Sequence, residues 1–234
     1  MTDDLTPFLA SRPATVDRPL IGLTVLLVED SRFASEAMRL LCLRSGARIR
    51  RADCLRSAHR HLQTYRPGVV VVDMGLPDGS GADLIREVKA MAAPVPAVLG
   101  LSGDPNAEAE AMLAGADAFL AKPLESLTRF QQVVLQILQD GNRPNGPHLV
   151  KDDLILPDPL ALRDDLHHVA EVLAAAHDRA ATDYVAHFLT GIARSARDPA
   201  LETAAEELGR APEPAAISRL SGIVQDRLAA AAGF

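Results

Sequence analysis

Short apolar runs alternate with segments of helical periodicity over residues 23–139 of the chain. The strongest run, residues 69–72, consists of four consecutive valines, which is typical of a strand buried on both faces. Five strand–helix units in alternation predict an α/β fold, a doubly wound parallel sheet with helices on both faces. We expect the strands at residues 24–28, 47–51, 69–72, 97–101 and 118–120, and the helices at about 31–46, 55–65, 83–92, 107–113 and 127–138.

The pattern then changes to helices alone. Residues 140–147, DGNRPNGP, are rich in Gly, Pro and Asn, and they are expected to lie in a linker. The first residues are interrupted by prolines and predict an extension with little structure of its own. The predicted organisation is an extension over 1–22, an α/β domain over 23–139, a linker over 140–149 and an all-α C-terminal domain over 150–234.

The C-terminal region carries an apolar seam. From Leu162 to Ala176 apolar side chains recur in steps of four and three residues, a heptad-like pattern. This pattern suits either a small intramolecular bundle or a helical hairpin that dimerises. Further helix boundaries are predicted from the N-cap pair Asp198–Pro199, from Gly209 as a stop, and from Gly233 as the end of the last helix.

Composition and charge argue against nucleic-acid binding, membrane insertion and secretion. The net charge is −7, and residues 150–234 alone account for −6 of it. An acidic region of this kind is a poor candidate for binding the phosphate backbone of a nucleic acid. We therefore expect no nucleic-acid partner. No apolar run reaches the length of a membrane span, the N-terminus lacks the apolar core of a secretory signal, and Cys42 and Cys54 are expected to be reduced. A cytoplasmic protein is expected.

Polar groups follow four of the predicted strands. Glu29 and Asp30 follow the first strand, Asp73 the third, Ser102 the fourth and Lys122 the fifth. In an open parallel sheet these carboxyl ends border one crevice, where ligands bind. Three carboxylates at one place repel one another unless a divalent cation such as Mg²⁺ lies between them. Together with a lysine and a hydroxyl, they fit phosphoryl transfer onto a carboxylate.

Residues 23–139 resemble the receiver domain of two-component response regulators, the CheY-like family. The resemblance covers about half of the chain and rests on four motifs at the predicted strand ends. They are LLVEDS with Glu29 and Asp30, VVVDMGLPDGSG with Asp73, GLSGD with Ser102, and GADAFLAKP with Phe119 and Lys122.

The resemblance implies a flavodoxin-like fold with strand order 2-1-3-4-5. It also implies that Asp73 accepts a phosphoryl group from a sensor histidine kinase or a histidine phosphotransfer protein. Mg²⁺ would be held by Asp30, Asp73 and the backbone carbonyl of Gly75, with Glu29 acting through water. Such a chain is a regulatory protein that promotes its own phosphorylation and dephosphorylation, not an enzyme with a separate substrate.

The remaining motif residues have roles implied by the same resemblance. Ser102 and Lys122 would contact the phosphoryl group, and a cis bond before Pro123 would aim Lys122. Ser102 and Phe119 would form the switch. Phe119 stands where the family often has a tyrosine, so it offers no hydroxyl. Gly75 supplies no side chain at a position that tunes phosphoaspartate hydrolysis in the family.

The output of the C-terminal region is less well indicated. We expect a helical module that binds a protein target or forms a homodimer. A histidine phosphotransfer module is an alternative, because His167 and His168 both fall off the apolar stripe and are expected to be exposed. His177 and His187 are expected on the surface or in packing. A transcriptional regulator is a further alternative, although no recognition-helix pattern is visible.

Overall fold

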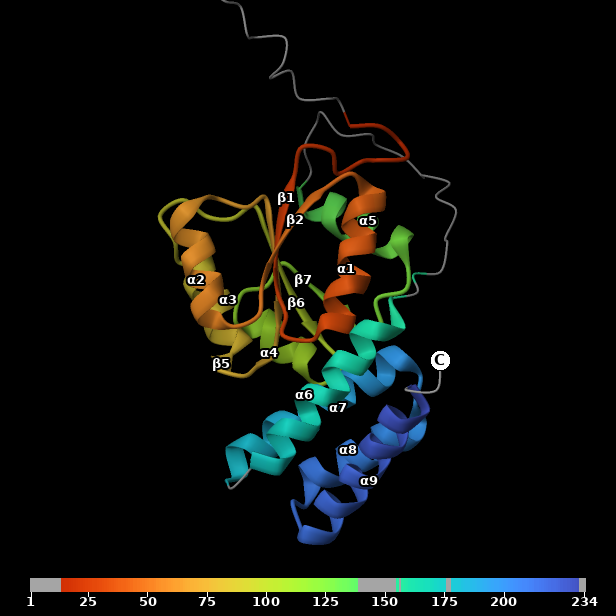
Figure 1. The fold of residues 1–234 in the computed structure, drawn as a ribbon. Helices are drawn as coiled ribbons and strands as arrows, with labels where there is room; N and C mark the ends of the chain where they lie inside the picture. The colour runs from red at the N-terminus through yellow and green to blue at the C-terminus, as the bar shows by residue number, and fades with distance from the viewer. Residues whose placement is uncertain (1–13, 139–154, 156, 176–177, 232–234) are drawn as a thin grey trace, which may run out of the picture.

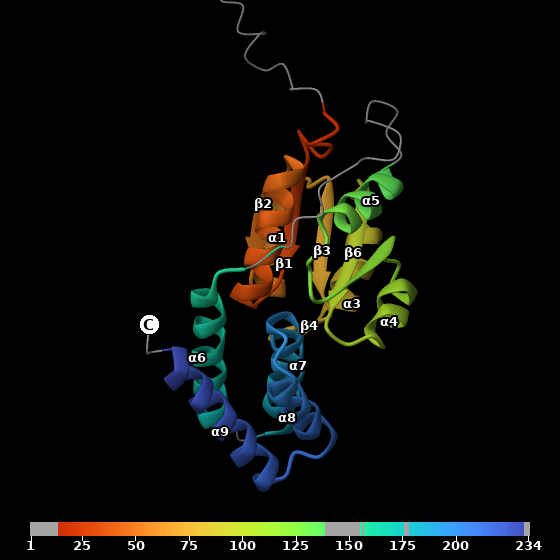
Figure 2. The same cartoon turned by 90° about the vertical axis from the view of Figure 1, so that its right-hand side faces the viewer.

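The computed structural model describes residues 14–138, 155, 157–175 and 178–231. Its centre is a five-stranded parallel sheet of order β2-β1-β3-β6-β7, which is 2-1-3-4-5 among the main strands (Figures 1 and 2). The predicted flavodoxin-like fold is confirmed. The strands are β1 (Thr24–Val28), β2 (Arg48–Ala52), β3 (Val69–Asp73), β6 (Ala97–Ser102) and β7 (Ala118–Ala121).

Helices cover both faces of the sheet because each strand alternates its side chains between two apolar clusters. One face packs against α2 (Leu55–Thr64), α3 (Gly81–Lys89) and α4 (Ala107–Leu113). The other packs against α1 (Arg32–Ser45) and α5 (Leu127–Leu138). Strand β3 lies in the middle and every one of its residues is buried, which explains its continuous run of valines.

Local signals set the start and end of α1 as expected. The hydroxyl of Ser31 accepts a hydrogen bond from Ala34 N at 3.0 Å, and Gly46 ends the helix with a φ of +83°. Helix α3 differs from the prediction of 83–92. It begins at Gly81 because the hydroxyl of Ser80 accepts a hydrogen bond from Ala82 N, which caps the helix earlier.

A small hairpin follows the central strand and was not predicted. Strands β4 (Gly75–Leu76) and β5 (Gly79–Ser80) pair antiparallel and form the loop between β3 and α3. Two-residue strands of this kind leave no hydrophobic periodicity in a sequence. The hairpin places Gly75 directly beside the end of the central strand.

The C-terminal region forms a separate all-α unit at the carboxyl end of the sheet (Figures 1 and 2). Leu166, Val169 and Leu173 of the predicted seam are buried in a cluster that joins all four of its helices. The seam thus serves an intramolecular bundle. The helices are α6 (Pro159–Ala175), α7 (Arg179–Ala196), α8 (Pro199–Arg210) and α9 (Pro214–Ala231).

Two helix ends in this bundle bear on the sequence expectations. Asp198 caps α8 as expected, with Leu201 N donating to its carboxylate at 3.1 Å. The prediction that Gly209 ends this helix is wrong, because α8 continues to Arg210. A Cβ atom on Gly209 would lie 3.4 Å from Ala186 Cβ, an ordinary contact distance, so α8 passes close to α7 at this residue.

Several expectations fall at the edges of the described regions. The predicted linker over 140–149, Gly233 and His177 lie outside the described residues. Leu20, within the predicted extension, is fully buried against the α1 side of the sheet. Cys42 and Cys54 are both free, as expected. None of the helices in the described parts of the chain is long and apolar enough to span a membrane.

The first prediction contrasts a buried with an exposed leucine. Leu99, in β6, is fully buried, whereas Leu113, at the end of α4, is 86% exposed. Leu99→Ala should lower the free energy of unfolding by about 2–5 kcal/mol, because it removes buried methyl groups and leaves a cavity. Leu113→Ala should change it by about 0.5 kcal/mol or less. Urea unfolding of both variants checks this, and equal effects would contradict the assigned core.

Candidate functional site

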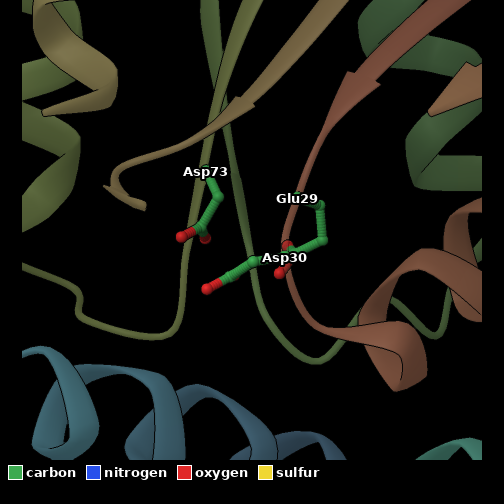
Figure 3. Close-up of side chains that lie close together, drawn as sticks. All are labelled: Glu29, Asp30 and Asp73. Atoms are coloured by element: carbon green, nitrogen blue, oxygen red, sulfur yellow. The ribbon is translucent and has the colours of Figure 1, made fainter. Parts of the chain in front are cut away.

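Three carboxylates lie together at the carboxyl edge of the sheet. Glu29 and Asp30 follow β1, and Asp73 is the last residue of β3. Oxygen atoms of all three lie within 4.8 Å of one another, and Figure 3 shows them gathered between the ends of the two strands. Because neighbouring parallel strands end at the same edge, residues 44 positions apart in the chain meet here.

A buried lysine bridges two of these carboxylates. Lys122, after β7, places its Nζ atom 2.8 Å from Glu29 Oε2 and 2.8 Å from Asp73 Oδ1. The three side chains are 7%, 0% and 3% exposed, respectively. The peptide bond between Lys122 and Pro123 is cis, as the motif predicted. The structure therefore brings the predicted lysine into contact with the predicted phosphoacceptor.

Burial and like charge shift the proton affinities of the site. Burial, and then the neighbouring charge of Asp73, raise the pKa of Asp30 to about 6. Burial also raises the pKa of Glu29 well above its usual value, although Lys122 opposes this. For Lys122, burial alone would lower the pKa, but the charges of Asp73 and Glu29 outweigh burial and raise it. The lysine thus remains charged, and the net negative charge of the cluster disfavours full ionisation.

The donor set fits a hard divalent cation. Carboxylate oxygens are the ligands that Mg²⁺ prefers, and such ions are commonly held by one or two carboxylates together with water and phosphate oxygens. Asp30 and Asp73 offer these oxygens directly, and Glu29 lies within the same group. Gly75 adjoins it, since its N–H donates a 3.0 Å hydrogen bond to Asp73 Oδ2. These residues could hold Mg²⁺.

The predicted switch residues lie nearby but make other contacts. The buried Ser102 hydroxyl accepts a hydrogen bond from Asp104 N at 3.0 Å, within its own loop. Phe119 is half-buried and packs against the α4 side of the sheet, where its ring reaches Gly100. Their predicted roles toward a phosphoryl group remain predictions.

The C-terminal bundle contributes residues that sequence reasoning missed. The buried Asp165 of α6 accepts hydrogen bonds from Ser31 Oγ at 2.8 Å, Arg32 N at 2.8 Å and Phe33 N at 3.0 Å. Tyr184 of α7 donates to Asp30 Oδ2 at 2.7 Å. These contacts join positions more than 130 residues apart, and no motif in the sequence marks either residue.

The candidate phosphotransfer histidines border a cleft beside the site. His167 and His168 are both exposed, as expected from the helical pattern. They line a cleft of about 710 Å³ together with Asp30 and Tyr184. His187 is half-buried on α7, and its ring lies against Gly75. The site is thus bordered by imidazoles that come from the bundle.

Fold and site together define a doubly wound domain of the receiver class. Residues 25–134 match the family model described as the response regulator receiver domain, and this part of the chain belongs to that family. The chain therefore contains the receiver domain of a two-component response regulator. The matched residues end before α6, so this finding does not extend to the C-terminal bundle.

Curated relatives include transcriptional regulators. The chain is 32% identical over 99 residues to the KDP operon transcriptional regulatory protein KdpE of Escherichia coli K12, covering 42% of this chain and 44% of that protein. It is 30% identical over 114 residues to the virulence transcriptional regulatory protein PhoP of Salmonella typhimurium, covering 47% and 51%. The chain thus spans about half the length of the curated relatives it matches.

Solved structures similar to this one are receiver domains and response regulators. A putative response regulator from Chloroflexus aurantiacus has 29% identity and a TM-score of 0.47, and covers 50% of this chain and 98% of its own. The receiver domain of a Pseudomonas aeruginosa sensor histidine kinase, solved with a magnesium ion in its active-site cleft, has 21% identity and a TM-score of 0.46. That match covers 51% and 99% of the two chains.

The second prediction concerns the charge of Asp30. The pKa of Asp30 is about 6 in the folded protein and 3.8 is its usual value, so the folded protein binds this proton more tightly than the unfolded chain. The resulting contribution to the free energy of unfolding is fully present below about pH 4 and is lost as the pH rises through 6. Asp30→Asn, which can still accept from Tyr184, should therefore raise the free energy of unfolding by about 2 kcal/mol at pH 7.5 without divalent cations. The gain should vanish toward pH 4.

Urea unfolding in EDTA at both pH values checks this prediction. Asp83→Asn is the matched control, because the Asp83 side chain is 66% exposed and lies away from the cluster. The control should show no comparable gain. Destabilisation by Asp30→Asn at pH 7.5 would contradict a raised pKa of Asp30 in the folded protein.

Proposed function

We propose that this protein is a phosphorylation-activated response regulator in which Asp73 accepts a phosphoryl group. The donor is a phosphohistidine on a sensor histidine kinase or a histidine phosphotransfer protein. The chain is a regulatory protein that promotes its own phosphorylation and dephosphorylation, and it acts in the cytoplasm. The observation that carries this proposal is the contact of Lys122 Nζ with Asp73 Oδ1 in a buried acidic cluster.

The chemistry follows from the positions of these groups. The phosphorus–nitrogen bond of the donor breaks, a bond forms between phosphorus and an oxygen of Asp73, and the imidazole of the donor leaves. Lys122, already 2.8 Å from Asp73, stays charged and pairs with the phosphoryl oxygens. The Ser102 hydroxyl, at the end of β6, donates to another phosphoryl oxygen once it rotates out of its own loop.

A divalent cation would complete this site. Asp30, Asp73 and the Gly75 carbonyl are proposed as its ligands, with Glu29 acting through water. When bound, Mg²⁺ neutralises charge on the transferred group, which is the main catalytic requirement of phosphoryl transfer. Its charge also offsets the repulsion among the three carboxylates.

The output is proposed to be a protein–protein interaction of the C-terminal helices, with a protein target or with a second copy of the chain. Its seam residues are already used within the bundle, so a partner would meet another face. Phe119 and Ser102 are proposed to change position on phosphorylation. A second candidate is a transcriptional regulator, which the names of the curated relatives favour.

The third prediction concerns the phosphoacceptor. Asp73→Asn should abolish labelling by acetyl phosphate with Mg²⁺, because an amide oxygen cannot form the acyl phosphate. Asp83→Asn, an exposed aspartate on α3, should label like the unmodified chain. Mass spectrometry and base lability of the label check this. Base-stable, acid-labile label that survives Asp73→Asn would instead indicate a phosphohistidine, with His167 and His168 as candidates.

The fourth prediction separates the two outputs. Filling the site with beryllofluoride and Mg²⁺ should change the sedimentation coefficient of the full chain, because association depends on the state of the site. Its affinity for duplex DNA should stay weak, since the C-terminal region carries −6. Tight, salt-dependent DNA binding would instead favour a transcriptional regulator.

A further inference from the structure

Helices α6 and α7 lie on the loops that form the receiver site. They contact the loops after four strands: β1 through Asp30, β3 through Gly75, β6 through Gly103 and β7 through Lys122. At the centre of these loops Asp73 is only 2% exposed. The bundle lies over the carboxyl edge of the sheet, as Figure 2 shows for α7.

The contact of α6 with the receiver is polar and fully paired. Asp165 accepts two backbone N–H bonds, from Arg32 and Phe33, and one hydroxyl bond from Ser31. These groups form the N-terminus of α1, where unpaired N–H groups and the helix dipole favour a negative charge. Asp164 adds an exposed ion pair with Arg32. The amides of Arg32 and Phe33 are thus protected only while α6 is docked.

The contact of α7 falls on a proposed cation ligand. The Tyr184 hydroxyl donates to Asp30 Oδ2 at 2.7 Å. Its ring packs against Phe188 at 5.6 Å between centroids, and Phe188 in turn meets His168 at 5.8 Å. These neighbours hold the hydroxyl in place. The bond uses a carboxylate oxygen that is also a candidate ligand for the cation.

Further along, α7 approaches the site closely through the His187 ring and through its backbone at Gly191. A Cβ atom on Gly75 would lie 2.0 Å from the His187 ring, and one on Gly103 would lie 2.8 Å from Gly191 Cα. At Gly103 the close atoms belong to the backbone of α7, so the loop and the helix approach this closely only because the residue is glycine. At Gly75 a side chain would force the His187 ring to move. A protein donor cannot bring a phosphohistidine to Asp73 through this contact.

We propose that the C-terminal bundle is a built-in cover of the phosphoacceptor site and that Tyr184 senses whether the site is filled. The covered form keeps the Tyr184–Asp30 bond and protects Asp73. Filling the site withdraws the Asp30 oxygen from Tyr184 and disfavours the covered form. This inference rests on the proposed function, and it makes the signal pass directly from the site to the bundle.

The covered and uncovered forms are linked to cation binding. A ligand that binds only the uncovered form shifts the population toward the uncovered form. By reciprocity, any change that destabilises the covered form raises the affinity for the ligand. Tyr184→Phe removes one hydroxyl and keeps the ring packing. It should therefore tighten Mg²⁺ binding to the full chain by about 3- to 30-fold, the range expected for a hydrogen bond to a charged group that partly competes.

Tyr65→Phe is the matched control, because Tyr65 is the other tyrosine of the chain and its hydroxyl meets His61 on α2. It should leave Mg²⁺ affinity unchanged. Titration calorimetry on both full-length variants measures this. Weaker Mg²⁺ binding in Tyr184→Phe would overturn the proposal, since Tyr184 would then be orienting Asp30 for the cation.

Hydrogen exchange tests the cover itself. In the full chain, beryllofluoride with Mg²⁺ should speed exchange of the Arg32 and Phe33 amides about tenfold or more, because Asp165 leaves them. Tyr184→Phe should already show faster exchange at these amides before the ligand is added. Unchanged exchange with the site filled would overturn the proposal.

The fluorine spectrum of the same samples reports whether beryllofluoride is bound. Bound fluoride with protected Arg32 and Phe33 amides would refute the cover while leaving the phosphoacceptor site intact. A spectrum without bound beryllofluoride at saturating concentration would refute the proposed function of Asp73 and, with it, the sensing by Tyr184. The two failures are thus distinguishable.

Discussion

The bridge from Lys122 to Glu29 and Asp73 is the interaction on which the site depends. Three carboxylates at the end of a buried sheet repel one another, and burial adds to the free-energy cost of each charge. One ammonium group 2.8 Å from two of them offsets part of this repulsion. The remaining excess of negative charge leaves the site suited to a divalent cation, whose charge together with Lys122 would offset that of a phosphoryl group.

The parallel sheet is what makes this cluster possible. Each strand carries its polar residues at its carboxyl end, and the order β2-β1-β3-β6-β7 places β1 and β3 side by side. Their apolar interiors fix the position of the strand ends, since the register of β1 on β3 is held by fully buried valines and leucines. The core thus determines the geometry of the charges.

The bundle adds a second layer of control to this arrangement. Asp165 extends the hydrogen bonding of α1, and the Tyr184 hydroxyl donates to Asp30. Contacts between separate units of one chain are exchangeable for contacts with ligands or partners, because both draw on the same surface groups. A domain that covers a site can therefore respond to what the site holds without a relay through the receiver core.

Much of the receiver could be predicted from the sequence. Continuous valines indicated the central strand, Ser31 and Gly46 marked the ends of α1, and the strand-end residues Asp73 and Lys122 indicated one site. These signals are local, or they repeat with the period of a strand or helix, so they can be recognised in the sequence alone. The β4–β5 hairpin and the start of α3 were missed because a serine cap and two short strands leave little periodicity.

The docking of the bundle was decided only by the tertiary structure. The seam predicted from Leu162 to Ala176 fits an intramolecular bundle and a dimer equally well, since both bury the same stripe of side chains. Gly209 resembles a helix stop but lies inside α8, where this helix packs on α7. Tyr184 and Asp165 are ordinary residues in the sequence. They became part of the site only because folding set their helices against loops more than 130 residues away in the sequence. Contacts over such distances produce no periodic pattern from which the sequence could predict them.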